Sequence, residues 1–473
     1  MKPKTNILDN TFVSITDQAH AAILPDLQGN ILKHHGRTHA WHIFLKFNSE
    51  QIVDAKTWIV QFAIHEVTNS QKQLDDAAKK DADTTFDGGT FKNISLSASG
   101  YKKLGIPASQ MPADIAFLAG LKNRTTVTND NLHNWEEAFA GEIDAIIIVA
   151  DRSISVSVKE KNALLSAVAP FANVVHLQKG KVLKNQHGIG IEHFGYADGI
   201  SQPDFLKPAD KNANQWDDGG ALLNTLLVKE PELDNSFGSY FVFRKLEQNV
   251  LRFKTEEKSL PIVKEGVDGS NIGTDNGELA GAMIIGRFED GTEVINHSSE
   301  QKIVDEKLLS NDFDYRDDNA ISSSKGSKCP FHAHIRVTNP RGDVGDFAKT
   351  VRLTRRGIPF NDIGRDEFDL DNDQPEDGVG LLFMCYQSSI VNQFEFIQQR
   401  WANQGDIGGH MVGQDAIIGQ GANGTNKFLP VQWGIDPLSP IVPQKVPSTF
   451  RDFVTMRGGE YFFTPSIGFL KNL

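Results

Sequence analysis

Strand-like and helix-like segments alternate in a fixed order along the first half of the chain, and this order restricts the fold more than any other feature. The aromatic run at 40–47 is typical of a strand, and residues 49–63 place apolar side chains at helical spacing. An apolar run at 145–150 predicts a central strand, and a helix at 158–168 and a strand at 174–178 follow it. This alternation of strands and helices predicts an α+β fold with helices on one face of an antiparallel sheet.

The second half shows the same pattern again, after a polar, turn-rich segment at 231–235. We therefore expect two domains of one fold, residues 1–230 and residues 231–473, since domains of about 100–200 residues are usual. A glycine-rich stretch at 403–426 is expected to be a surface loop. The expected elements of the second half are strands at 238–244, 333–337, 351–354 and 380–386, and a helix at 391–401.

The composition of the chain limits which binding partners and which cellular location are expected. The net charge of −13 and the pI near 5.5 argue against a nucleic acid or an anionic membrane as the main partner. With only Cys329 and Cys385, a disulfide framework is not the design, and packed thiols are expected. We find no apolar run of signal-peptide or membrane-span length, so we expect a cytoplasmic protein.

Asp198 stands in the run Phe194-Gly-Tyr-Ala-Asp-Gly-Ile-Ser-Gln-Pro, between apolar neighbours and glycines. An aspartate before a glycine commonly caps a turn, and this structural interpretation competes with a functional one. A carboxylate placed among apolar side chains is also suited to transfer protons. Its partners decide between the two interpretations.

Two histidines follow about 130 residues later, in Cys329-Pro-Phe-His-Ala-His-Ile-Arg. On a strand, His332 and His334 would share one face. Each imidazole could be a hydrogen-bonded core residue, and the spacing of neighbouring ligands does not favour zinc. A single imidazole that faces a cavity suits an axial ligand of haem iron.

Arg355 and Glu395 are the remaining candidates. A guanidinium in a strand-turn before Gly357 and Pro359 is costly to bury without an anion, so Arg355 either pairs with an acid or binds a ligand. In a peroxide-cleaving site it would stabilise charge on the departing oxygen. Glu395 lies between two phenylalanines on the expected helix, and is either a half-exposed helix acid or the acceptor for the ring N–H of a metal-bound histidine.

The ordered set of motifs resembles the dye-decolorising peroxidases, a family of haem peroxidases, from about Asp26 to the C-terminus. The motifs that carry the resemblance are Gln28-Gly-Asn-Ile-Leu, Gly195-Tyr-Ala-Asp-Gly with Ile-Ser-Gln-Pro, Cys329-Pro-Phe-His-Ala-His-Ile-Arg, Asn339-Pro-Arg, Arg355-Arg-Gly-Ile-Pro-Phe, and Gln393-Phe-Glu-Phe-Ile-Gln with Trp401. The resemblance implies two ferredoxin-like α+β domains, with haem b held mainly in the C-terminal one. It also implies hydrogen peroxide and organic electron donors as partners, and it leaves the oligomeric state open.

The resemblance assigns roles residue by residue. It implies that Asp198 is the distal acid, that Arg355 is the distal arginine and that His334 is the proximal iron ligand. An aspartate in this role predicts best activity at acidic pH, because the ordinary pKa of aspartate, about 3.9, is well below that of histidine, about 6.5. The positions matched to the proximal acid and to the apolar distal wall are Glu395, Leu381 and Phe383.

The sequence departs from the family pattern at two positions and leaves other functions open. His332 stands where the family often has alanine, and Asn361 where many relatives have glycine. A haem-handling protein, or a structural protein in which the acid, the imidazole and the arginine form a salt-bridge network, are the alternatives. Aromatic residues that would relay electrons from large dyes, or else simply pack in the core, are Tyr386, Trp401, Trp433 and Tyr461.

Overall fold

The structure is a computed structural model of the chain. It describes residues 7–9, 13, 18–83, 85–203, 205–206, 222–231, 233–260, 278–297, 299–315, 329–420, 427–429, 446–448 and 450–473.

The N-terminal half has the ferredoxin-like order of elements. Its strands are β1 (His39–Phe47), β2 (Phe91–Leu96), β3 (Ala145–Asp151) and β4 (Ala172–Lys181), and its main helices are α2 (Ile52–His65), α3 (Ser70–Ala82) and α8 (Ile154–Val168). The strands are antiparallel and lie in the order β4-β1-β3-β2. All seven residues of β3 are buried, because helix α8 packs on one face and the interior of the molecule on the other. Apolar side chains spaced at helical intervals on α2, namely Ala55, Ile59, Phe62 and Ala63, fill the same core.

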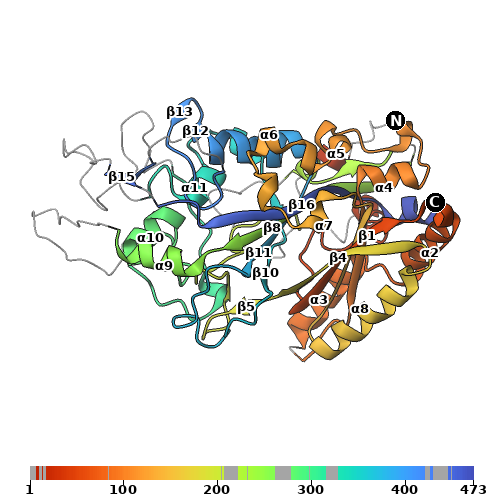
Figure 1. The fold of residues 1–473 in the computed structure, drawn as a ribbon, viewed down its shortest axis with the longest axis horizontal. Helices are drawn as coiled ribbons and strands as arrows, with labels where there is room; N and C mark the ends of the chain where they lie inside the picture. Colours follow the sequence, from red (N-terminus) through yellow and green to blue (C-terminus); the bar gives the residue numbers. More distant parts are fainter. Residues whose placement is uncertain are drawn as a thin grey trace, which may run out of the picture.

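The C-terminal half repeats this order with other residues. Its strands are β8 (Phe237–Gln248), β10 (Ile358–Asn361), β11 (Val379–Gln387) and β16 (Val454–Thr464). They lie antiparallel in the order β10-β11-β8-β16, which is the same arrangement of first, second, third and fourth strand as in the N-terminal half. The two ferredoxin-like halves lie side by side in Figure 1, the N-terminal half in red to yellow and the C-terminal half in green to blue.

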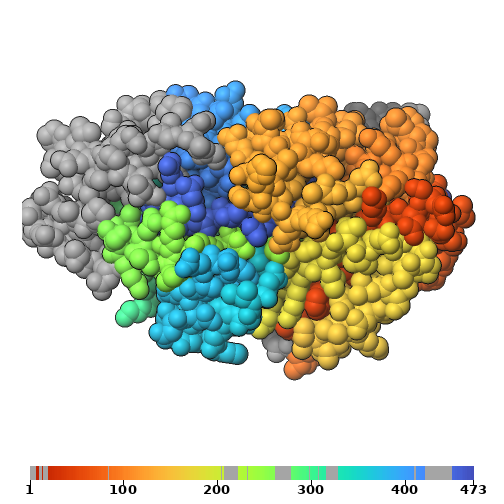
Figure 2. Space-filling model, in the orientation of Figure 1, coloured from red at the N-terminus to blue at the C-terminus, as the bar shows by residue number. Residues whose placement is uncertain are grey.

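One sheet runs through both halves and curls into a barrel. β16 pairs with β2 at Phe463 and Leu96, which joins the two sets of strands. At the other end β10 contacts β4, and the side-chain amide of Gln178 donates to Asp362 at 2.9 Å. On the face shown in Figure 2 the two halves form a continuous surface. Where the chain divides into folding units remains a prediction, since the sheet itself has no break there.

Aromatic rings fill the inside of the barrel. The rings of Phe44 on β1 and Phe243 on β8 meet edge to face, with centroids 4.9 Å apart, and Phe462 on β16 packs beside Phe44. Because side chains alternate along a strand, Arg244 and Leu246 point to the outer face of the sheet. This outer face carries the candidate site.

Several expectations for the second half are wrong. The expected strand at 333–337 is the helix α11 (His334–Thr338), since a turn from Pro330 to Ala333 starts it and Pro340 stops it soon afterwards. The expected strand at 351–354 is confined to β9 (Thr354–Arg355). The helix expected at 391–401 is present but is wound as two π-helical segments, η8 (Ile390–Glu395) and η9 (Ile397–Asn403).

The last helix of the chain packs against the N-terminal half. Helix α13 (Ile467–Lys471) packs on α2 and buries Ile467 and Leu470. Within the described residues no helix is both long and apolar enough to cross a bilayer.

Candidate active site

A cavity lies on the outer face of the C-terminal half of the sheet. Strand β8 contributes Arg244, Leu246 and Gln248 to its wall, and β11 contributes Leu381 and Phe383. All of its described lining residues fall between Glu192 and Val454. The positions expected to form an apolar wall, Leu381 and Phe383, therefore do line a cavity.

The segment that carries Asp198 is bent around glycines. Gly195 and Gly199 have φ values of 99° and 81°, a left-handed region that glycine adopts without strain. The carboxylate of Glu192 fixes the first bend by accepting the backbone N–H groups of Phe194 and Tyr196, at 2.9 and 3.0 Å. Asp198 itself lies at the cavity, with its side chain 28% exposed.

Arg355 reaches the same region from β9. Its backbone N–H donates to the side chain of Gln202 at 2.9 Å, and its guanidinium Nη1 donates to Asp198 Oδ1 at 2.9 Å. Both residues line the cavity and remain partly exposed to it. The acid that the sequence led us to expect beside Arg355 is thus Asp198, and the structure brings together two residues 157 positions apart.

His334 enters the cavity from another element, as the first residue of α11. Its ring nitrogen Nδ1 lies 3.0 Å from Asp415 Oδ2. The Asp415 side chain is fully buried, and its other oxygen accepts the backbone N–H groups of Ile417 and Ile418. A carboxylate held in this way accepts the Nδ1 proton and leaves Nε2 of His334 as the nitrogen with a lone pair.

The second imidazole does not share the position of His334. We expected His332 and His334 on one face of a strand, but the chain turns at Ala333 and starts a helix, so the two side chains diverge. His332 is buried and is not among the described residues that line the cavity.

Glu395 was the wrong choice for the partner of His334. Its carboxylate forms two hydrogen bonds with the guanidinium of Arg124, at 2.9 and 2.5 Å, and accepts the hydroxyl of Tyr461 at 3.2 Å. Its side chain therefore bridges Arg124 of the N-terminal half and Tyr461 on β16, and does not reach His334. The actual partner, Asp415, lies in the stretch that we expected to be a surface loop, where neither strand nor helix periodicity marked it.

Four other arginines surround the cavity besides Arg355, namely Arg244, Arg287, Arg341 and Arg352. Arg244 pairs with the buried Asp130. Arg287 is 4% exposed, and burial lowers the pKa of its guanidinium. Its Nη2 donates to no acceptor among the described residues, which is costly for a buried polar group. An anionic edge of a ligand would satisfy this donor.

These features fit a haem group. Leu381, Phe383 and other apolar side chains supply walls for a flat apolar ring. The imidazole of His334, oriented by a buried carboxylate, is a suitable donor to iron. The Nη2 of Arg287, which has no acceptor among the described residues, suits a carboxylate at the edge of the ring.

Three of the four aromatic residues considered as electron relays are described, and none of these three is at the surface. Tyr386, Trp401 and Tyr461 are at most 2% exposed. Trp433 lies outside the described residues. The three described side chains are core residues, so none of them can touch a large donor directly.

Comparison with known proteins places this barrel and its cavity in a class and then in a family. Residues 26–183 match the model of the DyP dimeric alpha+beta barrel domain, so the chain is an α+β barrel protein of that class. Residues 194–411 match the model of the Dyp-type peroxidase C-terminal domain. The chain belongs to the DyP-type peroxidase family, whose members are haem enzymes that use hydrogen peroxide.

Individual relatives are similar to this chain along nearly its whole length. The multifunctional dye peroxidase DyP2 of Amycolatopsis sp. is 37% identical over 486 residues, which cover 97% of each chain. Peroxidase 2 of Mycetinis scorodonius is 28% identical over 95% of this chain and 87% of that protein. The crystal structure of a DyP-type peroxidase from Anabaena sp. superposes with a TM-score of 0.83 at 37% identity, covering 96% of this chain and 95% of the other.

Proposed function

We propose that this chain is a haem b peroxidase in which Asp198 and Arg355 act on hydrogen peroxide while His334 binds the iron. The observation that carries the proposal is the grouping of an acid–arginine pair and a histidine–carboxylate pair around one cavity. The haem would lie against strands β8 and β11 of the C-terminal half, since these strands supply the wall of the cavity. When bound, haem would supply an iron centre that gives two electrons to the peroxide as its O–O bond breaks and regains them one at a time from the donors.

Asp198 moves the proton. For the O–O bond to break heterolytically, a proton must leave the peroxide oxygen that stays and reach the oxygen that departs as water. The carboxylate of Asp198 is partly exposed to the cavity and can accept this proton and return it. The glycines on either side let the backbone come close to a flat ring and aim the carboxylate at its open face.

Arg355 orients the peroxide and stabilises negative charge on the departing oxygen. Its Nη1 is occupied by Asp198, and its Nη2 makes only a long contact of 3.5 Å with the carbonyl of Ser201. The guanidinium can therefore hold the acid and donate to peroxide at the same time. A donor fixed in place before the reaction needs no reorganisation as charge develops.

His334 and Asp415 form the proximal side in this proposal. The Nδ1–H donated to Asp415 fixes the ring and makes Nε2 a stronger electron donor to a metal. Leu381 and Phe383 keep the cavity apolar and limit water. Glu395 has no part here, because it holds Arg124 and Tyr461.

The reducing substrates are organic donors such as dyes and phenols, each giving one electron, so two are consumed for each peroxide. Support comes from the relatives, which are named as dye peroxidases. The cytoplasmic location expected from the sequence remains a prediction, which cell fractionation tests.

Rapid mixing of the haem-loaded protein with hydrogen peroxide tests the proposal. We expect Asp198→Ala to keep its Soret band but to react with peroxide about 10²–10⁴-fold more slowly. An undiminished rate would remove Asp198 from the mechanism. A haem-handling protein would instead transfer haem to an apo-acceptor readily and turn over a dye with peroxide poorly in the wild type.

A further inference from the structure

The residue after the distal arginine has an unusual environment. Arg356 directly follows β9 and is 8% exposed, and unlike Arg355 it is not among the described residues that line the cavity. Its backbone N–H donates to the carbonyl of Met384 on β11 at 2.7 Å. The guanidinium forms no ion pair with a described carboxylate, and burial lowers the pKa of Arg356 to about 10, so it remains charged at neutral pH. A buried charge of this kind is expensive unless its hydrogen bonds are well placed.

The guanidinium of Arg356 bridges two distant parts of the chain. Its Nη1 donates to the carbonyl of Arg355 itself at 2.8 Å. Its Nε and Nη2 donate to the carbonyls of Asn30 and Ile31, at 2.6 and 2.8 Å, about 325 residues earlier. One planar group thus ties the peptide of the distal arginine to the segment Gln28–Leu32 of the N-terminal half.

The segment that presents these carbonyls is itself fixed. Gln28 exchanges two hydrogen bonds with the backbone of Ile94 on β2, and it also donates to the carbonyl of Pro465. Gly29 has no room for a side chain, because an added Cβ would lie 2.8 Å from the ring of Phe91. Asn30 adopts a left-handed φ of 74°. The motif Gln28-Gly-Asn-Ile-Leu therefore forms a rigid platform of carbonyl groups.

We propose that Arg356 is a positioning residue that fixes the backbone of Arg355 against the platform Gln28–Leu32, so that the N-terminal half sets the aim of the distal guanidinium. This inference rests on the proposed distal role of Arg355. Without Arg356 the carbonyl of Arg355 and those of Asn30 and Ile31 lose their donors. The two-residue strand β9 then depends only on its pairing with β11 and on Gln202.

Fluoride affinity of the haem-loaded ferric protein tests the aim of Arg355 without turnover. Fluoride on the iron accepts a hydrogen bond from a distal guanidinium, so its dissociation constant reports where that group points. We expect Arg355→Gln to weaken fluoride binding about 10–100-fold, the value of a charge-assisted hydrogen bond. We expect Arg356→Gln, at full haem content, to weaken it about 3–10-fold, because a misplaced donor loses much of its effect. The rate of reaction with peroxide should fall in parallel.

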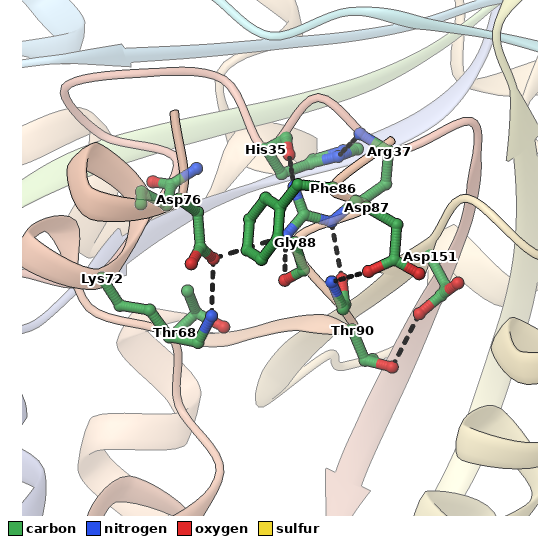
Figure 3. A network of polar contacts seen from close by, with 12 residues as sticks. His35, Arg37, Thr68, Lys72, Asp76, Phe86, Asp87, Gly88, Thr90 and Asp151 are labelled. Carbon is green, nitrogen blue, oxygen red and sulfur yellow. Dashed lines mark hydrogen bonds and ion pairs between the residues drawn. The ribbon is translucent and has the colours of Figure 1, made fainter. Parts of the chain in front are cut away.

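Arg37 offers a matched control. Its guanidinium is also 9% exposed and donates to three backbone carbonyls, those of His35, Gly88 and Gly89. Figure 3 shows this arrangement, in which Arg37 also approaches Asp76 at 3.8 Å, away from the cavity. Arg37→Gln should lower the free energy of unfolding as Arg356→Gln does, yet leave fluoride affinity within about twofold of wild type.

The outcomes separate the inference from the proposed function. If Arg355→Gln leaves fluoride affinity unchanged, the distal role of Arg355 fails. If Arg355→Gln weakens binding and Arg356→Gln does not, only the positioning role of Arg356 is overturned. Should Arg356→Gln fail to accumulate, Arg356→Lys decides: an intermediate fluoride affinity supports the inference, and the wild-type value overturns it. A loss in Arg37→Gln as large as that in Arg356→Gln would also overturn it.

Discussion

The two halves of the barrel share one strand order but use the outer face of the sheet differently. In the N-terminal half, α8 lies against β1, β3 and β4, and β3 is buried along its whole length. In the C-terminal half the helix after the equivalent strand β11 is π-helical, and three of its residues, Phe394, Ile397 and Gln398, line a cavity instead of closing on the sheet.

The difference shows that topology alone does not make the site. The same βαββαβ order can be closed by a helix that fits the sheet, or can leave space if polar residues such as Arg244 and Gln248 stand on the outer face of β8. Segments inserted between the elements, which carry Asp198, His334 and Asp415, then surround that space. The N-terminal half contributes from a distance, through the platform that holds Arg356.

Removal of the imidazole should have the largest effect. His334→Ala takes away the only nitrogen that we assign to the iron, so the purified protein should retain little haem at equimolar supply. The haem-to-protein absorbance ratio measures this. His332→Ala is the control, since its side chain is not part of the described cavity wall, and it should keep haem. Haem retained by His334→Ala but lost by His332→Ala would show that we chose the wrong histidine.

Paired truncations compare the packing of the two regions directly. Phe44 is fully buried among the rings of Phe139, Phe243 and Phe462, so Phe44→Ala should cost about 3–5 kcal/mol of unfolding free energy. Phe383 already faces the cavity on one side, so Phe383→Ala should cost roughly 1–2 kcal/mol in haem-free protein. Urea unfolding of the haem-free variants measures both. Equal costs would mean that the outer face of β11 is packed as tightly as the barrel interior.

Asp415 and Glu395 should affect different properties, namely the reduction potential of the haem iron and the stability of the fold. Asp415→Asn keeps the shape of the side chain but makes it a weaker acceptor for the ring N–H of His334. The haem iron should therefore become easier to reduce, and the turnover of the enzyme should fall about 10–100-fold. Glu395→Gln should leave the reduction potential unchanged and lower the unfolding free energy by roughly 1–3 kcal/mol, since Arg124 is partly exposed. Spectroelectrochemical titration distinguishes them. A shifted potential in Glu395→Gln alone would restore our first assignment of the proximal acid.

The fold and the site could be predicted from the sequence only in part. In the N-terminal half, regular periodicity predicted β1, α2, β3, α8 and β4, where packing follows the pattern of apolar residues, but it did not predict β2 or α3. The motifs led to Asp198, Arg355 and His334, which the structure places around one cavity. Periodicity failed around His334, where alternating residues suggested a strand, because the turn at Ala333 and the stop at Pro340 leave only a short helix.

Asp415 and Arg356 could not be found from local sequence for a different reason. Asp415 lies between Gly413 and Gly419, where no periodicity marks it, and only the approach of α11 brings the imidazole of His334 to its carboxylate. Arg356 looks like a second basic residue beside Arg355, and its meaning depends on carbonyl groups more than 300 positions away. Both roles arise from contacts between segments that are remote in the chain.

The smallest effect we expect is a difference in pH dependence between the two regions. In the cavity wall, burial and the nearby charge of Asp198 raise the pKa of Glu192 to about 7. The folded protein thus keeps a proton that the unfolded chain releases near pH 4.5, and the unfolding free energy falls as pH rises from about 4.5 to 7. In the barrel, burial lowers the pKa of His42 to about 4. Here the unfolded chain binds the extra proton, so stability rises from about pH 4 to 6.5.

Glu192 and His42 change the unfolding free energy in opposite directions as pH rises, and the Glu192→Gln variant separates the two contributions. Glutamine cannot ionise, and it keeps one of the two oxygens that accept the backbone N–H groups of the bend. Urea unfolding of haem-free protein between pH 5 and 7 should therefore show stability rising with pH more steeply in the variant than in the wild type, by at most about 1.4 kcal/mol per pH unit. Identical slopes would mean that Glu192 is ionised throughout this range. In that case the cavity wall is wetter than its burial indicates, and the contrast with the closed barrel becomes stronger.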